Sequence, residues 1–313
     1  MRRWFMAAVI AAGCAGLNAA TAVAFGGWQG PTVSVGGAVT TPTTYSTPQL
    51  GTLPQTTFTV TRHVWWRTQT LTDQGVPLED LVNDAAPVLP SAKNAALRVT
   101  VTVAGRFGRS VTLALGELDP SFGNHPAYLA LTEDGHSLPA PELVVPGDRF
   151  GLRTVTDVSR ITVAVQSPAP TTTSPTATEL TIIDGNRTRE LTDAQLAALP
   201  AETLQVSFEA GTAPQTHTEV GPSLDAVLRA AHLISGLNTW VAGVGDDGYV
   251  AVVTPAEQWV GGRPLQISLN EDGTALAEPR LVVDGDLKGG RYVSDLVDLV
   301  VGNALQAGGP WWR

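Results

Sequence analysis

The chain has little of what builds disulfide frameworks, charged surfaces or membrane spans. A single cysteine, Cys14, occurs in 313 residues, which excludes a fold held together by disulfides. Charged residues make up only 15% of the chain, and its net charge is −10. Nucleic-acid binding is therefore disfavoured, because neutralising phosphates requires clustered Lys and Arg. Beyond the N-terminal segment no apolar run approaches the roughly 20 residues of a membrane span, so we expect none in the mature protein.

The N-terminus has the character of an export signal. A positive start, Arg2-Arg3, precedes an apolar stretch, and Ala22-Val23-Ala24 then offers the small residues of a cleavage site. We expect a signal peptide over residues 1–24 and a protein that is secreted, periplasmic or held in the cell envelope. A twin-arginine signal and an ordinary secretory signal both fit the two arginines. A lipidated Cys14 and an uncleaved anchor are further alternatives.

Four sequence blocks occur twice, in the same order. Gly75-Val76-Pro77-Leu78 returns as Gly221-Pro222-Ser223-Leu224, an offset of 221 − 75 = 146. Farther on, Glu133-Asp134-Gly135 returns as Glu271-Asp272-Gly273, an offset of 271 − 133 = 138. A repeat period this long predicts two globular units and excludes a solenoid of short repeats.

The repeats suggest where the units begin and end. We place the first unit at residues 30–166 and the second at residues 179–303. Residues 167–178 are rich in Pro and Thr and predict an extended linker between the units. Residues 304–313 form a C-terminal tail with no counterpart in the first unit.

Short strands and a few short helices are expected in each unit. Thr192 predicts an N-cap for a helix over residues 193–199, and Ser223 predicts one for a helix over residues 224–234. The other predicted segments are a helix over residues 77–86 and strands over residues 33–39, 57–60, 97–103, 110–115, 143–145, 159–165 and 249–253.

The order of these segments resembles the molybdopterin-binding domain of the sulfite oxidase family. The first unit is most similar at Gly75-Val76-Pro77-Leu78, at residues 115–120 and at residues 143–153. The second unit is most similar at residues 221–228, 245–249 and 281–291. The resemblance covers most of the mature chain, although no single motif is specific. It implies a mixed α+β fold with curved sheets and a molybdopterin cofactor.

In that family, arginines and a glycine near the end of the domain reach the pterin phosphate. Arg149, Gly151 and Arg153 keep this pattern in the first unit, and Lys288 and Arg291 lie at the matching place in the second. We take these five as candidate cofactor-binding or anion-binding residues, because glycine admits close backbone approach and guanidinium groups pair with anions. Turn glycines with solvated arginines before a last strand are the alternative interpretation.

The family's metal ligand is missing from both units. The family holds molybdenum through a cysteine, and residues 56–68 and 202–218, where it would lie, contain none. The five histidines show no metal-ligand spacing, and we expect His125 and His136, in Gly- and Pro-rich turns, to be solvated. We therefore assign no catalytic residue, no metal ligand and no bound cofactor.

These observations predict an exported, non-catalytic binding or accessory protein built on two degenerate molybdopterin-binding-like units. Its partner would be a small anionic ligand or another protein. Two alternatives remain: an oxidoreductase that still holds molybdopterin without the cysteine, and a structural protein of the cell envelope.

Overall fold

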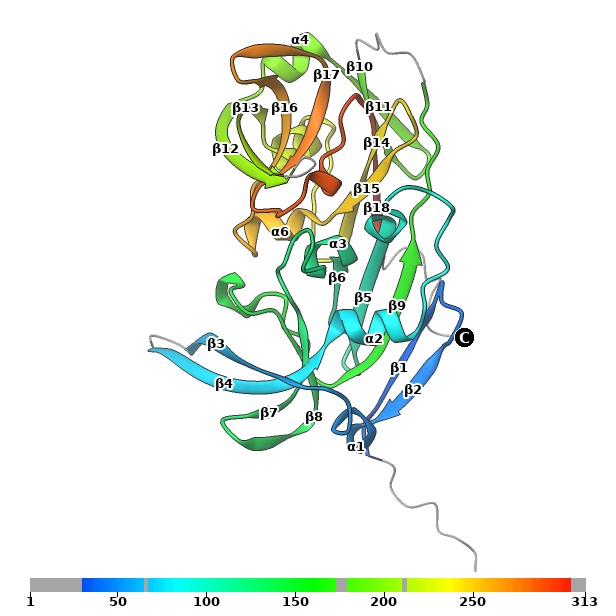
Figure 1. The fold of residues 1–313 in the computed structure, drawn as a ribbon, viewed down its shortest axis with the longest axis vertical. Helices are drawn as coiled ribbons and strands as arrows, with labels where there is room; N and C mark the ends of the chain where they lie inside the picture. The colour runs from blue at the N-terminus through cyan, green and yellow to red at the C-terminus, as the bar shows by residue number, and fades with distance from the viewer. Residues whose placement is uncertain (1–29, 65–66, 173–178, 210–212, 305–313) are drawn as a thin grey trace, which may run out of the picture.

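The computed structural model describes residues 30–64, 67–172, 179–209 and 213–304. The predicted signal peptide, half of the linker and nearly all of the tail lie outside the described residues. Within them the same arrangement of two sheets occurs twice, once in residues 32–165 and once in residues 179–303 (Figure 1).

The first half contains nine strands, three short α-helices and two 3-10 turns among its described residues. They are β1 (Thr32–Gly37), β2 (Thr43–Ser46), α1 (Thr47–Leu50), β3 (Thr56–Val64), β4 (Arg67–Pro77), α2 (Leu78–Asp84), η1 (Ala95–Arg98), β5 (Val99–Gly105), β6 (Ser110–Ala114), α3 (Leu115–Leu118), β7 (Tyr128–Glu133), β8 (His136–Val144), η2 (Arg149–Gly151) and β9 (Val158–Val165).

The second half repeats this order, except that no element corresponds to η1 among its described residues. Its elements are β10 (Glu179–Asp184), β11 (Arg187–Thr192), α4 (Asp193–Ala197), β12 (Ala201–Glu209), β13 (Pro214–Pro222), α5 (Leu224–Ala230), β14 (Thr239–Gly245), β15 (Val250–Val253), α6 (Pro255–Trp259), β16 (Leu265–Glu271), β17 (Thr274–Val283), η3 (Gly289–Arg291) and β18 (Leu296–Asn303).

Each half consists of a five-stranded and a four-stranded sheet. The five-stranded sheets have the orders β2-β1-β9-β5-β6 and β11-β10-β18-β14-β15, and the four-stranded sheets β3-β4-β7-β8 and β12-β13-β16-β17. The first and last strands of each half pair in parallel, β1 with β9 and β10 with β18. This pairing brings the two ends of each half together in one sheet.

The expected α+β class is wrong, because strands dominate both halves. The longest helices in the described residues, α2 and α5, have only seven residues. Thr recurs at every second position along parts of β3 and β4, and β-branched side chains favour strands over helices. The predicted N-caps at Thr192 and Ser223 are confirmed, but the helix after Ser223 ends at Ala230, four residues earlier than expected.

Each half has its own hydrophobic core, and each contributes a leucine to the core of the other. Leu97 of the first half belongs to the core of the second, and Leu237 of the second half packs against the core of the first. Ala114, at the end of β6, packs in one small cluster with side chains of β14 and β15. The edges of the two five-stranded sheets therefore meet at an apolar contact, as the stacked halves in Figure 1 illustrate.

Polar contacts across this junction are reciprocal. The guanidinium of Arg98 donates to the carbonyl of Gly248 at 3.2 Å, and the side-chain amide of Asn238 donates to the carbonyl of Ser110 at 3.1 Å. Arg98 and Asn238 directly precede β5 and β14, and Ser110 and Gly248 are related by the repeat offset, 248 − 110 = 138. Each half therefore offers the other the same part of its surface.

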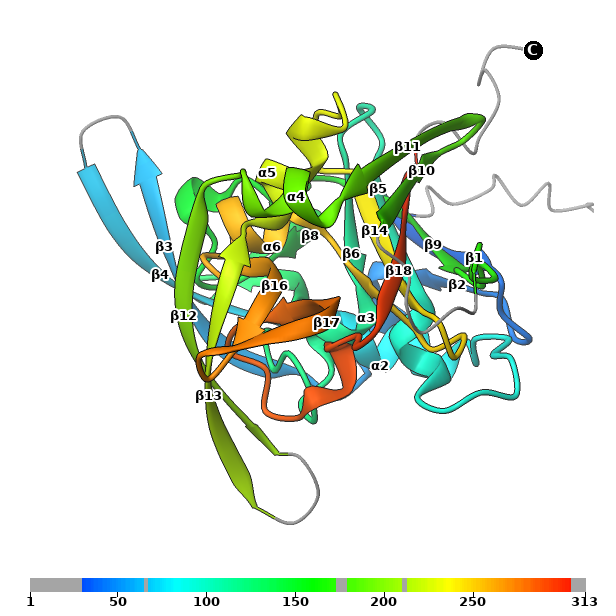
Figure 2. The same ribbon diagram turned by 90° about the horizontal axis from the view of Figure 1, so that it is seen from above.

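Two long hairpins extend away from this junction. The β3–β4 hairpin and the β12–β13 hairpin project from the body of the molecule in different directions (Figure 2). Within the described residues β3 and β12 are edge strands, and the outer edge of β12 is met only at its last residue, where the N–H of Glu209 donates to the carbonyl of Leu287 at 2.8 Å. The rest of both outer edges is open to pairing with another strand.

Candidate functional site

The five residues that the sequence pattern suggested fall into two groups. Arg149 and Lys288 are exposed, and Gly151 is half-buried with a φ of 59°, the left-handed conformation that favours glycine. Arg153 and Arg291, in contrast, are fully buried and rank first among the large buried side chains of the described residues. A buried guanidinium must be paired with acceptors, so the partners of these two arginines define their role.

Two carboxylates of the first half hold Arg153. Its Nε and Nη2 donate to the two carboxylate oxygens of Asp148 at 2.7 and 2.6 Å, and its Nη1 donates to Glu117 at 3.0 Å. Burial lowers the pKa of Arg153, but the two carboxylates outweigh burial and raise it. The side chain is therefore charged, and its donors are directed at protein carboxylates.

The second half repeats this arrangement around Arg291. Nε and Nη2 of Arg291 donate to Asp286 at 2.8 and 2.5 Å, and Nη1 donates to Glu257 at 2.6 Å. Arg291 and Asp286 match Arg153 and Asp148 by the repeat offset, since 291 − 153 and 286 − 148 both equal 138. We call the two sets of residues the first and second arginine clusters.

Corresponding local structures position the carboxylates. Asp148 and Asp286 follow the turn glycines Gly147 and Gly285, which have φ values of 88° and 85°. Glu117 and Glu257 lie in the short helices α3 and α6. A bidentate guanidinium–carboxylate pair requires the two groups to be nearly coplanar. The turns hold the aspartates in this position, and the short helices place the glutamates at the remaining nitrogen, Nη1.

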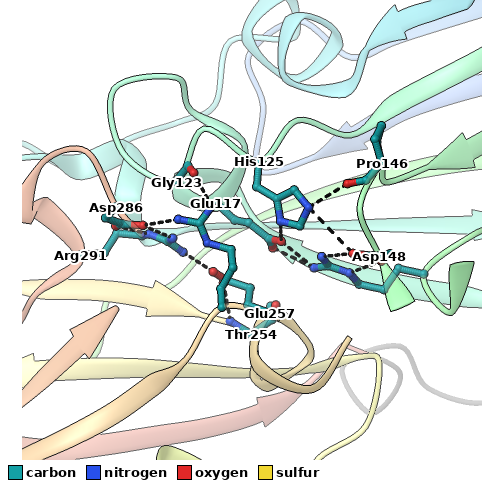
Figure 3. A network of polar contacts seen from close by, with 11 residues as sticks. Glu117, Gly123, His125, Pro146, Asp148, Thr254, Glu257, Asp286 and Arg291 are labelled. Atoms are coloured by element: carbon teal, nitrogen blue, oxygen red, sulfur yellow. Dashed lines mark hydrogen bonds and ion pairs between the residues drawn. The ribbon is translucent and has the colours of Figure 1, made fainter. Parts of the chain in front are cut away.

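Both arginine clusters lie against the opposite half. A Cβ added to Gly116 of the first half would lie 2.8 Å from Cδ of Arg291, and one added to Gly261 of the second half would lie 3.0 Å from Nη2 of Arg153. Glycine at these two positions therefore allows each half to approach the arginine of the other. Figure 3 shows the two clusters next to each other, each with its own set of polar contacts.

Backbone hydrogen bonds beside the clusters join the halves reciprocally. The N–H of Arg149 donates to the carbonyl of Val260 at 2.9 Å, and the N–H of Leu287 donates to the carbonyl of Phe122 at 2.8 Å. The repeat offset relates both donors and both acceptors, since 287 − 149 and 260 − 122 both equal 138. The arginine clusters are therefore part of the junction between the halves.

The charges of the two clusters influence each other through the junction. Burial raises the pKa of Glu117, but Arg153, His125 and Arg291 outweigh burial and lower it to about 2. Burial also raises the pKa of Glu257, and repulsion by Glu117 adds to burial against the attraction of Arg291. The clusters are thus one electrostatic unit rather than two separate ion pairs.

His125 does not lie in solvent, contrary to expectation. Its side chain is only 13% exposed, Nδ1 lies 3.1 Å from a carboxylate oxygen of Glu117, and Nε2 lies 3.0 Å from the carbonyl oxygen of Pro146. The chain returns to α3 after a turn, which places His125 beside Glu117. The nearby Gly and Pro shape this buried turn and do not indicate exposure.

A further charged cluster lies where the β3–β4 hairpin leaves the body of the molecule. Arg62 of β3 contacts Glu133 at 2.8 Å and Glu142 at 3.0 Å, with the buried Asp73 at 3.7 Å. Burial raises the pKa of Asp73 and of Glu142 despite the attraction of Arg62. One cation therefore faces three carboxylates where the hairpin leaves the body.

The residues present do not fit the cofactor that the resemblance implies. By the resemblance, the guanidiniums of Arg153 and Arg291 would reach the pterin phosphate, but buried carboxylates already neutralise both. A phosphate that replaced these carboxylates would leave the carboxylates buried without a counter-charge. The strands β3 and β12, where the family's thiolate would stand, carry no cysteine. Among the described residues, no group of three His, Cys, Asp or Glu side chains is arranged to hold a metal ion.

Sequence reasoning identified the two arginines but missed the carboxylates that hold them. The repeat contained a signal for Asp148 and Asp286, since both follow a Gly after the sequence Leu-Val-Val. For Glu117 and Glu257 the signal was weaker, because their offset, 257 − 117 = 140, departs from the value of 138 that relates the rest of both clusters.

Comparisons with known proteins add little. No protein-family model and no curated protein matches the chain. Among solved structures, it is similar to the sulfane dehydrogenase SoxCD from Paracoccus pantotrophus, with a TM-score of 0.35 and 15% sequence identity. The match covers 83% of this chain and 64% of that one. A similarity this weak carries no argument about function. Separately, no helix in the described part of the chain has the length and apolar character that a bilayer crossing requires.

Proposed function

We propose that the chain is an exported, non-catalytic binding or accessory protein whose two halves act as one rigid scaffold. One observation carries this proposal: the arginines that would hold a pterin phosphate are buried beside the junction, where each is held by carboxylates of its own half and packs against a glycine of the other half. Arg153 and Arg291 are buried, and each is paired with two carboxylates. The resemblance to the sulfite oxidase family then reflects an inherited scaffold whose site has become part of the junction.

The surfaces that we favour for a partner are the two hairpins and the exposed candidate residues Arg149 and Lys288. One face of the β3–β4 hairpin exposes a row of threonines, and the cross-strand register pairs Thr59 with Thr72 and Thr61 with Thr70. Hydroxyl groups and an unpaired strand edge favour a protein that adds a strand over a small anion. We therefore favour a protein partner at the hairpins.

Elemental analysis tests the non-catalytic assignment. The full chain, produced in a host that makes molybdenum cofactor, should contain far less than one molybdenum per chain. A sulfite oxidase prepared from the same host provides the control that the cofactor is supplied. Stoichiometric molybdenum in the purified chain would refute the proposal and favour the oxidoreductase alternative.

Export is tested separately, by fractionation and by the mass of the mature protein. Cleavage after Ala24 should leave a chain that begins at Phe25 and is found outside the cytoplasm. A full-length chain that is confined to the cytoplasm would contradict the export proposal without affecting the assignment of the junction.

A further inference from the structure

One difference between the two halves lies directly beside the arginine clusters. His125 and Arg263 are related by the repeat offset, 263 − 125 = 138, and the N–H of each donates at 2.9 Å to the carbonyl of the preceding cluster glutamate, Glu117 or Glu257. Their side chains are similarly buried, with exposures of 13% and 15%. One half thus has a titratable side chain where the other has a permanently charged one.

Arg263 shows what this position does when it is always charged. Its Nη2 lies 3.1 Å from Asp286 in its own half, and its Nη1 donates to the carbonyl of Gly123 in the other half at 2.5 Å. A cation here therefore neutralises the cluster and ties the two halves together.

Both ring nitrogens of His125 face oxygen acceptors. Nδ1 is 3.1 Å from Glu117, and Nε2 is 3.0 Å from the carbonyl of Pro146 and 4.0 Å from Asp148. A carbonyl or carboxylate oxygen cannot donate, and a neutral imidazole has only one N–H. A neutral ring with its proton on Nε2 can donate to the carbonyl of Pro146, but only the doubly protonated ring also places a proton and a positive charge at Nδ1, beside the Glu117 carboxylate.

The number of buried charges leads to the same conclusion. In the second cluster two guanidiniums face two carboxylates. In the first cluster Arg153 alone faces the carboxylates of Glu117 and Asp148, unless His125 carries a proton. A neutral His125 would leave a buried carboxylate without compensation at the junction, which is costly.

We propose that His125 is a pH-sensitive latch between the two halves: its protonated ring completes the first arginine cluster, and its deprotonation loosens the junction. Gly261 of the second half packs directly on the ring, since a Cβ there would lie 3.2 Å from Cε1 of His125. A change in the ring's charge is therefore felt at the contact between the halves. This inference does not depend on the proposed function.

The direction of the pH effect follows from the groups that face the ring. These are Glu117 from α3, Asp148 from the turn after β8, and the guanidinium of Arg153 behind them. Burial lowers the pKa of His125, but hydrogen bonding and attraction to Glu117 outweigh burial and the repulsion of Arg153, so the pKa is raised. The latch is thus fully closed below the ordinary histidine pKa of about 6.5 and opens as the pH rises through the raised value.

Urea unfolding between about pH 6 and 9 tests the latch with a matched pair of variants. In the wild type the unfolding equilibrium constant should increase with pH by up to about tenfold per unit, the limit for one proton. His125→Arg, which copies the second cluster, should remove this increase. His136→Arg adds the same charge at an exposed histidine and should behave like the wild type.

Amide hydrogen exchange locates the effect at the junction. The N–H groups of Arg149 and Leu287, which cross between the halves, should lose protection at high pH in the wild type, after correction for intrinsic rates, but keep it in His125→Arg. An unchanged pH dependence in that variant would overturn the proposal. Imidazole nitrogen chemical shifts of the wild type decide the matter if the variant does not fold: a doubly protonated ring at pH 7 supports the latch, and a neutral ring at pH 6 refutes it.

Discussion

The arginine clusters make a quantitative prediction about Arg153. Replacing it by Met keeps much of the side-chain volume but removes the only permanent charge between Glu117 and Asp148. The guanidinium is fully buried and its three donating nitrogens lie 2.6 to 3.0 Å from carboxylate oxygens, so little solvent screens the loss. Removing one partner from such a buried group costs about 3–5 kcal/mol of unfolding free energy.

Urea denaturation followed by tryptophan fluorescence measures this loss, and two further variants define its origin. Arg149→Met removes an exposed arginine four residues away and should change the unfolding free energy by about 0.5 kcal/mol or less. Adding Glu117→Gln and Asp148→Asn to Arg153→Met should recover much of the stability at pH 8, because no carboxylate is then left without a counter-charge and His125, which has lost its anionic partners, is neutral.

The triple variant distinguishes a loss of charge compensation from a loss of packing. If Arg153→Met destabilised the chain no more than Arg149→Met does, the guanidinium would not be the buried counter-charge that the geometry indicates. If the single variant were strongly destabilised and the triple variant no better, the loss would come from packing rather than from charge.

Three further predictions concern backbone fit, capping and charge. Gly75→Ala should destabilise the protein by about 3 kcal/mol, because its Cβ would collide with the carbonyl of Leu129 in the neighbouring strand. Gly36→Ala has open space around its Cβ and should be nearly neutral in the same denaturation assay. Ser223→Ala should cost about 1 kcal/mol in thermal or urea unfolding, since its hydroxyl caps α5. Glu142→Gln should stabilise the chain above neutral pH but not near pH 4. Burial raises the pKa of Glu142, so burying its charged form costs folding free energy, and this cost is absent once the carboxyl is protonated. Melting temperatures of variant and wild type that change in parallel with pH would contradict this.

Local chemistry in the sequence was enough to predict several elements correctly. Thr192 and Ser223 cap helices as expected, and the strands expected near residues 97–103 and 159–165 exist with bounds shifted by two residues or fewer. Such features depend on neighbouring residues only, which a single sequence records.

The largest errors concern segments whose structure depends on distant partners. The Ala201–Pro222 hairpin was not predicted, although Leu204, Val206 and Phe208 alternate with polar residues along β12. Its partner strand β13 has no such stripe, and β12 is mostly exposed. The solvated place expected for His125 was wrong for a related reason: the second half covers that turn, and no nearby residue indicates it. Burial is a property of the packed molecule and cannot be inferred from flanking Gly and Pro.

By itself, the sequence established that one unit occurs twice, that no cysteine follows Cys14, and that arginine and glycine recur at matched positions near the end of each unit. The tertiary structure alone decided what those arginines do. Arg153 and Arg291 would serve a bound anion or a protein carboxylate equally well, because a guanidinium pairs with either. The choice depends on which acceptor the fold brings within about 3 Å, and here turns and short helices bring Asp148, Glu117 and their counterparts.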